Sequence, residues 1–124
     1  MVRIAVVGNR DGWSKEFVFR VLQQEGIKPD DVIVSGGAFG VDSWVEEFAR
    51  TIKCKMVIHR PDMQVAFPYR FHQRNKKIAK DCERMIAFDK KQRSGTSQTI
   101  RFARELGKDV RVISNEKETK ENSN

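Results

Sequence analysis

The sequence predicts an α/β domain with a five-stranded, mainly parallel sheet and helices on both faces. Three observations lead to this fold class. Five short apolar runs alternate with four stretches in which apolar residues recur at helical spacing. The runs are rich in Val and Ile, which is typical of strands buried on both faces. Strands that alternate with helices in this way favour a parallel sheet joined by right-handed crossovers.

The individual elements follow from the apolar runs and from the residues at their ends. Ser14 is expected to cap the first helix, which Gly26 ends, and Gly107 is expected to end the last helix. No large apolar residue follows 113, so we expect one domain over 1–114 and a disordered polar tail over 115–124. The expected strands are 2–7, 32–34, 56–59, 84–88 and 110–113. Two further helices are expected over 41–52 and 69–81, and the last helix is expected to begin at Thr96 or Ser97.

The stretch 32–49 carries the strongest functional signal. An apolar strand runs into three glycines within five residues, Gly36, Gly37 and Gly40, and a helix follows. Glycines let the chain turn tightly and let a ligand approach the backbone, and the amino terminus of a helix offers free N–H groups. This order predicts a site for a phosphate or another anion. The alternative is a tight strand-to-helix turn that binds nothing.

Length and composition restrict the class of protein. The chain of 124 residues is long enough for one domain with its own core. It has no apolar run long enough to span a bilayer, and we expect no signal peptide because strand residues begin at Val2. The expected location is therefore the cytoplasm, without a membrane partner. Cys54 and Cys82 lack the spacing of metal ligands and are expected to be reduced.

The positive charge of the chain is concentrated in one region. The formal net charge is +7, and residues 67–93 hold nine Lys or Arg against three acids. A local basic region favours a phosphate-bearing partner, either a nucleotide or the backbone of a nucleic acid. The alternative is a solvated, lysine-rich face.

Polar and glycine-rich loops follow three of the predicted strands, at 8–13, 35–42 and 89–97. In parallel sheets, ligands bind at the carboxyl ends of the strands, where the strand order switches. We therefore expect these loops to converge on one cleft, joined by the helix that carries Arg74. That helix is expected to bury Phe71, Asn75, Ile78 and Cys82.

Four motifs in this order resemble the SLOG superfamily. They are Val7-Gly8-Asn9-Arg10, Ser35-Gly36-Gly37-Ala38-x-Gly40-Val41-Asp42, Arg74-Asn75-x-x-Ile78 and Ser94-Gly95-Thr96-x-x-Thr99-Ile100-x-x-Ala103. The resemblance covers nearly all of residues 2–113 and is closest to the small YspA-like proteins. The superfamily also includes the cytokinin-activating phosphoribohydrolases and the DNA-processing protein DprA. It implies a Rossmann-like three-layer sandwich with a phosphate-binding surface.

The resemblance implies that the ligand is a nucleotide, a nucleotide derivative or a nucleic acid. Other roles remain open for three of the residues: a surface ion pair for Arg10, stabilisation of the helix dipole for Asp42, and one more charge on a basic helix for Arg74. The ligand-contacting residues that the resemblance implies are Gly8, Asn9, Arg10, Ser35, Gly36, Gly37, Ala38, Gly40, Asp42, Arg74, Asn75, Ser94, Gly95 and Thr96.

One motif departs from that of the phosphoribohydrolases. Their segment Pro-Gly-Gly-x-Gly-Thr-x-x-Glu needs its glutamate for cleavage, and Thr99 stands at that position here. A threonine cannot act as a carboxylate base, so phosphate binding carries over better than catalysis. We therefore expect a sensor, carrier or sequestering protein for a nucleotide-like ligand. The alternatives are a nucleotide N-glycosidase that uses Asp11, Asp42 or Asp89, and a single-stranded nucleic-acid-binding protein that uses 67–93.

The remaining aromatic and histidine residues are given structural roles. Trp13 is either a base-stacking ring or, as we favour, a hydrophobic staple that packs on Val18. Trp44 falls in the core stripe of its helix. His59 and His72 lack partners at metal or catalytic spacing, so no metal and no certain cofactor is expected. A homodimer is expected by analogy with the relatives alone.

Overall fold

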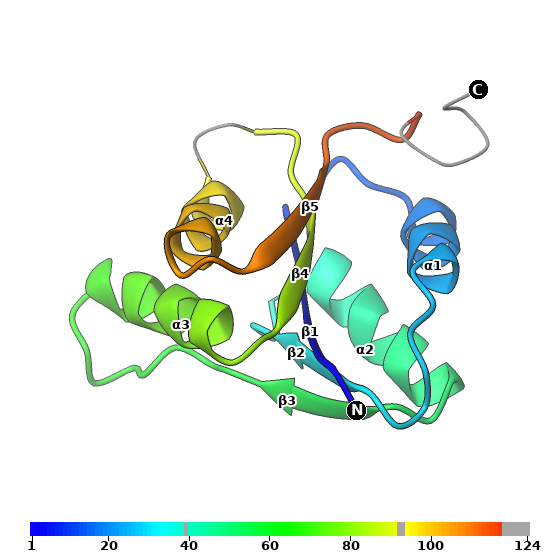
Figure 1. Cartoon of the computed structure of the whole chain (residues 1–124). Coiled ribbons are helices and arrows are strands. Elements are labelled where there is room, and N and C mark those ends of the chain that lie inside the picture. Colours follow the sequence, from blue (N-terminus) through cyan, green and yellow to red (C-terminus); the bar gives the residue numbers. More distant parts are fainter. Residues whose placement is uncertain (39, 92–93, 118–124) are drawn as a thin grey trace.

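The computed structural model is a three-layer α/β fold, with a parallel sheet between two pairs of helices (Figure 1). It describes residues 1–38, 40–91 and 94–117. The predicted Rossmann-like fold class is confirmed. In chain order the elements are β1 (Arg3–Gly8), α1 (Lys15–Gln24), β2 (Val32–Ser35), α2 (Val41–Thr51), β3 (Lys55–Ile58), α3 (Tyr69–Lys80), β4 (Arg84–Phe88), α4 (Gly95–Glu105) and β5 (Asp109–Ile113).

The strands lie in the order β3-β2-β1-β4-β5, and all neighbouring pairs are parallel. α1 and α2 cover one face of the sheet, and α3 and α4 cover the other (Figure 1). The chain first proceeds from β1 outward to β3 and then returns to β4 on the opposite side of β1. The strand order therefore switches between β1 and β4, where Gly8 pairs with Phe88. Sheets of this topology bind ligands beside such a switch point.

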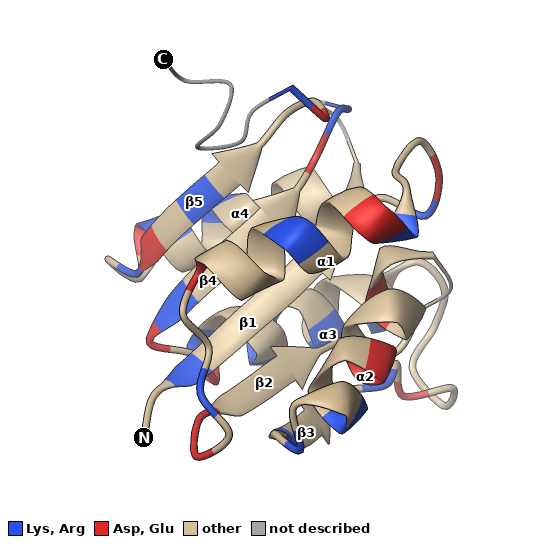
Figure 2. Cartoon of the chain, turned by 90° about the vertical axis from the view of Figure 1, so that its right-hand side faces the viewer, with Lys and Arg blue, Asp and Glu red and all other residues tan. Residues whose placement is uncertain are grey.

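Each face of the sheet has its own hydrophobic core. β1, β2 and β4 contribute alternate side chains to both cores because successive residues of a strand point to opposite faces. Charged residues lie mainly in the helices and the loops (Figure 2). The core under α1 and α2 includes Ile4, Val6, Phe17, Val45 and Phe48. The core under α3 and α4 includes Ala5, Val34, Ile78, Ile100 and Ala103.

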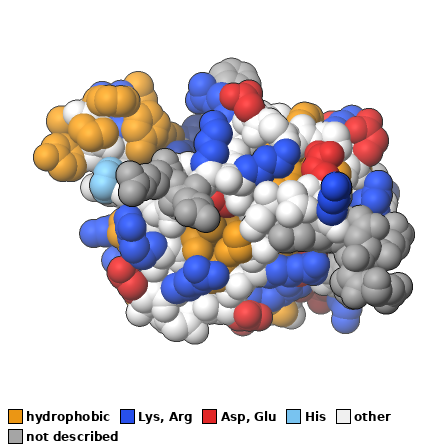
Figure 3. All heavy atoms as spheres, turned by 90° about the horizontal axis from the view of Figure 1, so that it is seen from above, with side chains coloured by type: hydrophobic (Ala, Val, Ile, Leu, Met, Phe, Trp, Pro, Cys, Tyr) orange, Lys and Arg blue, Asp and Glu red, His pale blue; other side chains and the backbone are white. Residues whose placement is uncertain are grey.

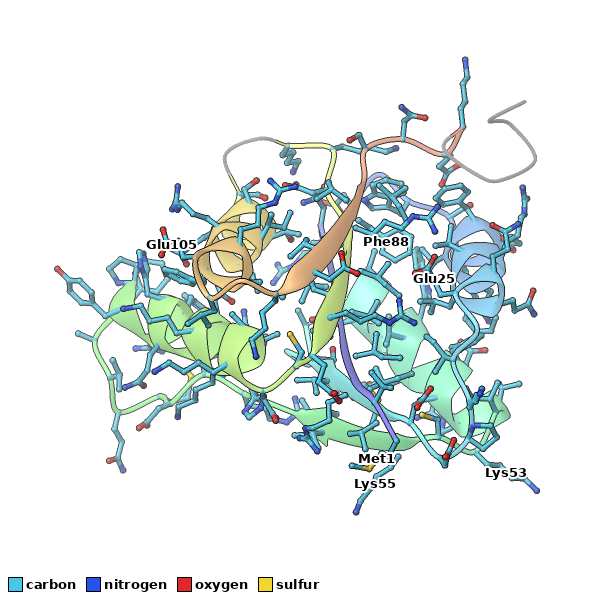
Figure 4. The ribbon with its side chains drawn as sticks, in the orientation of Figure 1. Met1, Glu25, Lys53, Lys55, Phe88 and Glu105 are labelled. Carbon is cyan, nitrogen blue, oxygen red and sulfur yellow. The ribbon has the colours of Figure 1, made fainter. Side chains whose placement is uncertain are left out.

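Trp13 is a core residue, as the staple interpretation predicts. Its side chain is buried and stacks on Phe17 with 5.7 Å between the ring centroids. It also meets the edge of Phe88 at 5.4 Å. Figure 4 labels Phe88, which points from the end of β4 toward α1. Val18 is buried in the same core as Trp13, and Trp44 is only partly buried at its margin.

The helix ends follow the predicted capping residues, with one difference. The Ser14 hydroxyl accepts a hydrogen bond from the Phe17 N–H at 3.3 Å. Gly26 and Gly107 adopt the positive φ angles, +71° and +75°, that suit a glycine after a helix. α4 begins earlier than predicted, because the Ser94 hydroxyl accepts from the Ser97 N–H at 3.1 Å and caps the helix.

α3 contradicts one assignment to the core. Phe71 is 36% exposed, whereas Asn75, Ile78 and Ala79 are buried. The physical reason is that the first turn of α3 extends away from the sheet (Figure 1). Cys82 is buried as predicted and, like Cys54, is a free thiol whose pKa burial raises.

Ion pairs fasten the helices to the sheet at the edge opposite the glycine-rich loops. Glu25, labelled in Figure 4, accepts a hydrogen bond from Arg84 at 2.9 Å and pairs with Arg111. Asp81 pairs with Arg3 at 2.7 Å, and its other carboxylate oxygen is hydrogen-bonded to His59, also at 2.7 Å. Among the described residues, none of the helices is long and apolar enough to cross a membrane.

Candidate functional site

The loops that follow β1, β2 and β4 meet at the carboxyl edge of the sheet, as predicted from their sequences. They surround a cavity of about 260 Å³, and α3 closes one side of it. The lining residues are Val7, Gly8, Asn9, Arg10, Gly36, Ala38, Asp42, Arg74, Asn75, Ile78, Lys91, Ser94, Gly95, Thr96 and Thr99.

Three residues of the predicted ligand set do not line this cavity. Ser35 is fully buried at the end of β2, and its hydroxyl accepts a hydrogen bond from the Gly37 N–H at 3.4 Å. A Cβ on Gly37 would lie 2.7 Å from the Ile58 side chain, so Gly37 allows the turn to pack on β3. Gly40 packs against the backbone of Arg10. These three residues therefore shape the turn without lining the cavity.

Arg74 connects α3 to the glycine-rich turn. Its Nη1 donates to the Gly36 carbonyl at 2.9 Å, and its Nε donates to the Asn75 side chain, also at 2.9 Å. A Cβ on Gly36 would lie 2.7 Å from Nη1, so the absence of a side chain there lets the guanidinium approach. Burial lowers the pKa of Arg74 and the charge of Asp42 opposes that shift, but an arginine remains protonated in proteins. The cavity therefore holds a fixed positive charge.

Asp42 lies in the first turn of α2 and is only 6% exposed. Its Oδ2 accepts a hydrogen bond from the Ala38 N–H at 3.0 Å. Within the described part of the chain, its Oδ1 has no partner that meets hydrogen-bond geometry. Burial raises the pKa of Asp42 to about 6, although the Ala38 amide, the Arg74 charge and, more weakly, the Gly36 amide favour the ionised form. Asp42 is the single acid among the described residues that line the cavity, and Arg10, Arg74 and Lys91 are the basic ones.

A hydrogen-bond network fixes the two loops at the switch point. Asp89, directly after β4, accepts hydrogen bonds from the Asn9 side chain at 2.8 Å and from the Ser94 hydroxyl at 3.1 Å, and Ser97 bonds its other oxygen. Asn9 in turn accepts from the Lys90 N–H at 2.7 Å. The network holds the loops after β1 and β4 in one arrangement. Asp89 is therefore occupied by structural bonds and does not line the cavity.

Asn75 and Thr99 complete the wall formed by α3 and α4. The buried Asn75 amide donates to Gln98 at 3.0 Å. Thr99 is also buried, and its hydroxyl donates to the Gly95 carbonyl at 3.0 Å. Sequence reasoning did not predict Lys91 as a lining residue. It considered Thr99 only as the residue that replaces the glutamate of the phosphoribohydrolase motif. The sign that could have identified Lys91 is its place in a polar loop directly after a buried strand.

A group of exposed apolar side chains lies beside the cavity. Met63, Phe67, Tyr69 and Phe71 form what we call the aromatic projection, and the first three are 66–70% exposed. Phe67 and Phe71 meet edge to face at 5.5 Å between centroids. Figure 3 views the carboxyl edge of the sheet and shows hydrophobic side chains gathered at one corner of this face. Tyr69 and Phe71 of this projection lie in the first turn of the basic helix α3.

Comparisons with known proteins agree with the predicted superfamily. The model of the DNA recombination-mediator protein A family matches residues 53–124. The fold is similar to that of DNA processing protein A (DprA) from Streptococcus pneumoniae, with a TM-score of 0.76 and 27% identity over 90% of this chain and 50% of that one. The chain thus spans about half the length of that protein. No curated protein matches the sequence.

Two further structures show the fold alone, because their sequence identity is low. The structural genomics target TM1055 has a TM-score of 0.69 and 22% identity over 89% of this chain and 72% of that one. DprA from Helicobacter pylori, described with a single-stranded DNA binding mode, has a TM-score of 0.70 and 21% identity over 90% and 64%. The closer likeness to the YspA-like proteins stays a prediction.

Proposed function

Because the chain belongs to the DNA recombination-mediator protein A family, we propose that it binds single-stranded DNA. In this proposal a phosphate of the strand occupies the cavity at the carboxyl edge of the sheet. The observation that supports it is that three basic residues, Arg10, Arg74 and Lys91, line one cavity. Glycine turns and the start of α4 line the same cavity. Charged donors and amides at the start of a helix are the groups that bind phosphate.

The surroundings of the cavity favour a strand over an isolated phosphate. The exposed rings of Phe67 and Tyr69 offer faces on which bases can stack. α3 carries further basic residues, among them Arg70 and Lys77, and basic side chains can follow a phosphate backbone. DprA from Helicobacter pylori, a protein with this fold, has a single-stranded DNA binding mode, which supports the same class of partner.

A free nucleotide or nucleotide derivative is the second candidate ligand, and the size of the cavity favours it. A volume of 260 Å³ is close to the lower end, about 300 Å³, of typical small-molecule sites. Such a ligand would place its phosphate near Arg74 and its sugar or base near Asp42. The protein would then act as a sensor, carrier or sequestering protein. A homodimer and a cytoplasmic location also remain predictions.

An N-glycosidase needs a carboxylate at the reacting carbon, and Asp42 is the group that could provide it. Release of free base from nucleoside monophosphates, abolished by Asp42→Asn, would establish this activity. We expect no release, because Thr99 replaces the glutamate of the phosphoribohydrolase motif and cannot take over its role.

The experiment that tests the proposal measures the fluorescence anisotropy of a labelled oligothymidylate of about 16 nucleotides, a length at the upper end of the site sizes of OB-fold domains that bind single strands. We expect saturable binding of the labelled strand, and we expect duplex DNA of equal length to be a poor competitor. Arg74→Ala should weaken binding at least about tenfold, because a charge-assisted contact to phosphate is lost. The matched control is Arg50→Ala, which removes the same charge from the far end of α2.

Competition separates the two candidate ligands. If unlabelled mononucleotides displace the oligonucleotide at equal concentration of nucleotide units, the free nucleotide is the better description of the ligand. If the protein binds neither class, or if Arg74→Ala and Arg50→Ala weaken binding equally, the proposed site is wrong. Native mass spectrometry of the purified protein provides an independent search for a retained nucleotide.

A further inference from the structure

Asp42 does not fit a cavity that only binds phosphate. Its carboxylate carries the same sign of charge as the ligand and is buried, which makes the charged form costly. One oxygen is used by the Ala38 N–H, whereas Oδ1 has no partner with hydrogen-bond geometry in the described residues. A buried acceptor without a donor costs free energy, and a ligand that brings the donor recovers it.

The charged groups around Asp42 do not supply that donor. Arg74, which approaches from α3, directs its Nη1 to Gly36 and its Nε to Asn75. Glu46 lies one turn further along α2 and carries the same charge as Asp42. Arg10 and Lys91 line the cavity from the loops after β1 and β4. The charges of Arg74 and Glu46 act on Asp42, but no hydrogen bond to Oδ1 results within the described chain.

We propose that Asp42 is a specificity-determining residue, whose Oδ1 accepts a hydrogen bond from the nucleoside next to the bound phosphate. This inference rests on the proposed function and names what the same site selects. A phosphodiester has no hydrogen to donate, so the donor is an N–H of the base or a hydroxyl of the sugar. The cavity would therefore prefer a nucleotide unit to a bare sugar–phosphate backbone.

The position of Ala38 makes Asp42→Asn an informative variant. The Ala38 N–H requires an oxygen at the position of Oδ2. The amide oxygen of the asparagine must therefore take that place, and its NH₂ group occupies the position of Oδ1. The substitution keeps size and shape, removes a negative charge and converts a free acceptor into a donor. Protonation of the carboxyl at Oδ1 makes the same conversion without a mutation.

The test compares the wild type with Asp42→Asn on four oligonucleotides of about 12 residues, within the range of one site. They are a deoxyuridine strand, a ribouridine strand, a strand of N3-methylated deoxyuridine that lacks the base N–H, and an abasic strand. Asp42→Asn should weaken binding of a strand that has the donor at least about tenfold. It should leave the affinity for the abasic strand unchanged or higher, because one repulsive charge is removed.

The strands identify the source of the donor. A loss for deoxyuridine that is absent for the N3-methylated strand assigns the donor to the base. A loss confined to ribouridine assigns it to the 2′ hydroxyl. Equal losses on all four strands would mean a structural role for Asp42 and overturn the inference, as would no loss on any strand. If the wild type binds none of the strands, the proposed function itself is wrong.

A pH series on the wild type provides a second measurement that does not depend on the variant. The affinity for the donor-bearing strand should fall as the pH is lowered through about 6, where Asp42 takes up a proton. The affinity for the abasic strand should not fall, since internal phosphodiesters do not titrate there. A parallel fall for both strands would contradict the inference.

Discussion

Gly40 lies directly against the backbone of Arg10, and a Cβ added to Gly40 would come within 2.2 Å of the Arg10 carbonyl oxygen. No real Cβ tolerates that distance, and the neighbouring atom is backbone that cannot rotate away. Gly40 also has a φ of +78°, which side chains disfavour. This contact joins the turn before α2 to the loop after β1, which are two of the walls of the cavity.

Gly40→Ala should therefore destabilise the fold by more than about 2 kcal/mol, the upper part of the cost of a positive φ alone. The measurement is the free energy of unfolding from urea denaturation. Gly26→Ala is the matched control, because Gly26 has a similar φ of +71° but no atom within 4 Å of the added Cβ. We expect it to cost about 1 kcal/mol. Equal costs would show that the contact with Arg10 is relaxed without strain.

Asp42 should destabilise the ligand-free protein in a manner that depends on pH. Its pKa is about 6 in the fold and 3.8 as the ordinary value, so the folded protein binds the additional proton between these pH values. As the pH rises, the unfolded chain loses this proton first, and the free energy of unfolding falls. The fall is complete above about pH 6, where Asp42 is ionised in both states. A shift of this size corresponds to about 3 kcal/mol.

Asp42→Asn should accordingly raise the free energy of unfolding by up to about 3 kcal/mol near pH 7.5, and by much less near pH 4.5. Urea denaturation of both proteins at the two pH values measures the difference. Other groups that titrate, such as Asp31 and Asp81 with their lowered pKa values, are present in both proteins and cancel. A constant difference at both pH values would contradict the raised pKa.

Lys91 should contribute to DNA binding through its charge alone. It is exposed, so Lys91→Ala should leave the fold intact. We expect weaker binding to strands of any base composition and a salt dependence whose slope is smaller by about 0.7, the value for one phosphate contact on a single strand. Anisotropy titrations at several salt concentrations measure the slope. Arg50→Ala should leave it unchanged, and a loss of affinity without a change in slope would exclude a phosphate contact at Lys91.

The aromatic projection should contribute to the binding of a strand but not of a mononucleotide. Phe67→Ala and Tyr69→Ala should each lower the affinity for the oligonucleotide about tenfold, since one stacked base contributes roughly 1–3 kcal/mol. Leu106→Ala, at another exposed apolar side chain, should have no effect. The same variants tested with a mononucleotide provide the contrast. Equal losses for both ligands would place the rings inside the phosphate site instead of beside it.

The sequence predicts the fold well because its signals are local. Apolar runs, the Ser14 cap and the two terminal glycines Gly26 and Gly107 each depend on nearby residues, and the structure has the elements that they predict. The position of the cavity follows from the same kind of signal, since the loops after three strands must meet at one edge of a parallel sheet.

The errors concern relationships between distant segments. Phe71 falls at core spacing in α3, but spacing cannot reveal that the first turn of the helix extends away from the sheet. Asp89 is a candidate catalytic carboxylate by sequence, and only the approach of Asn9, 80 positions earlier, shows that its oxygens are occupied. For Trp13, the local staple pattern cannot reveal that the ring also meets the edge of Phe88, which comes from the distant strand β4.

The walls of the cavity come from the end of β1, from the loops after β1, β2 and β4, and from α2, α3 and α4, so no single segment of the chain retains the site when the others separate. A ligand that binds there binds the complete domain and not the unfolded chain. By mass action it should then raise the free energy of global unfolding by about 2.7 kcal/mol at a concentration of 100 times its Kd. Occupancy would consequently slow hydrogen exchange throughout the central strands, far beyond the residues that the ligand touches.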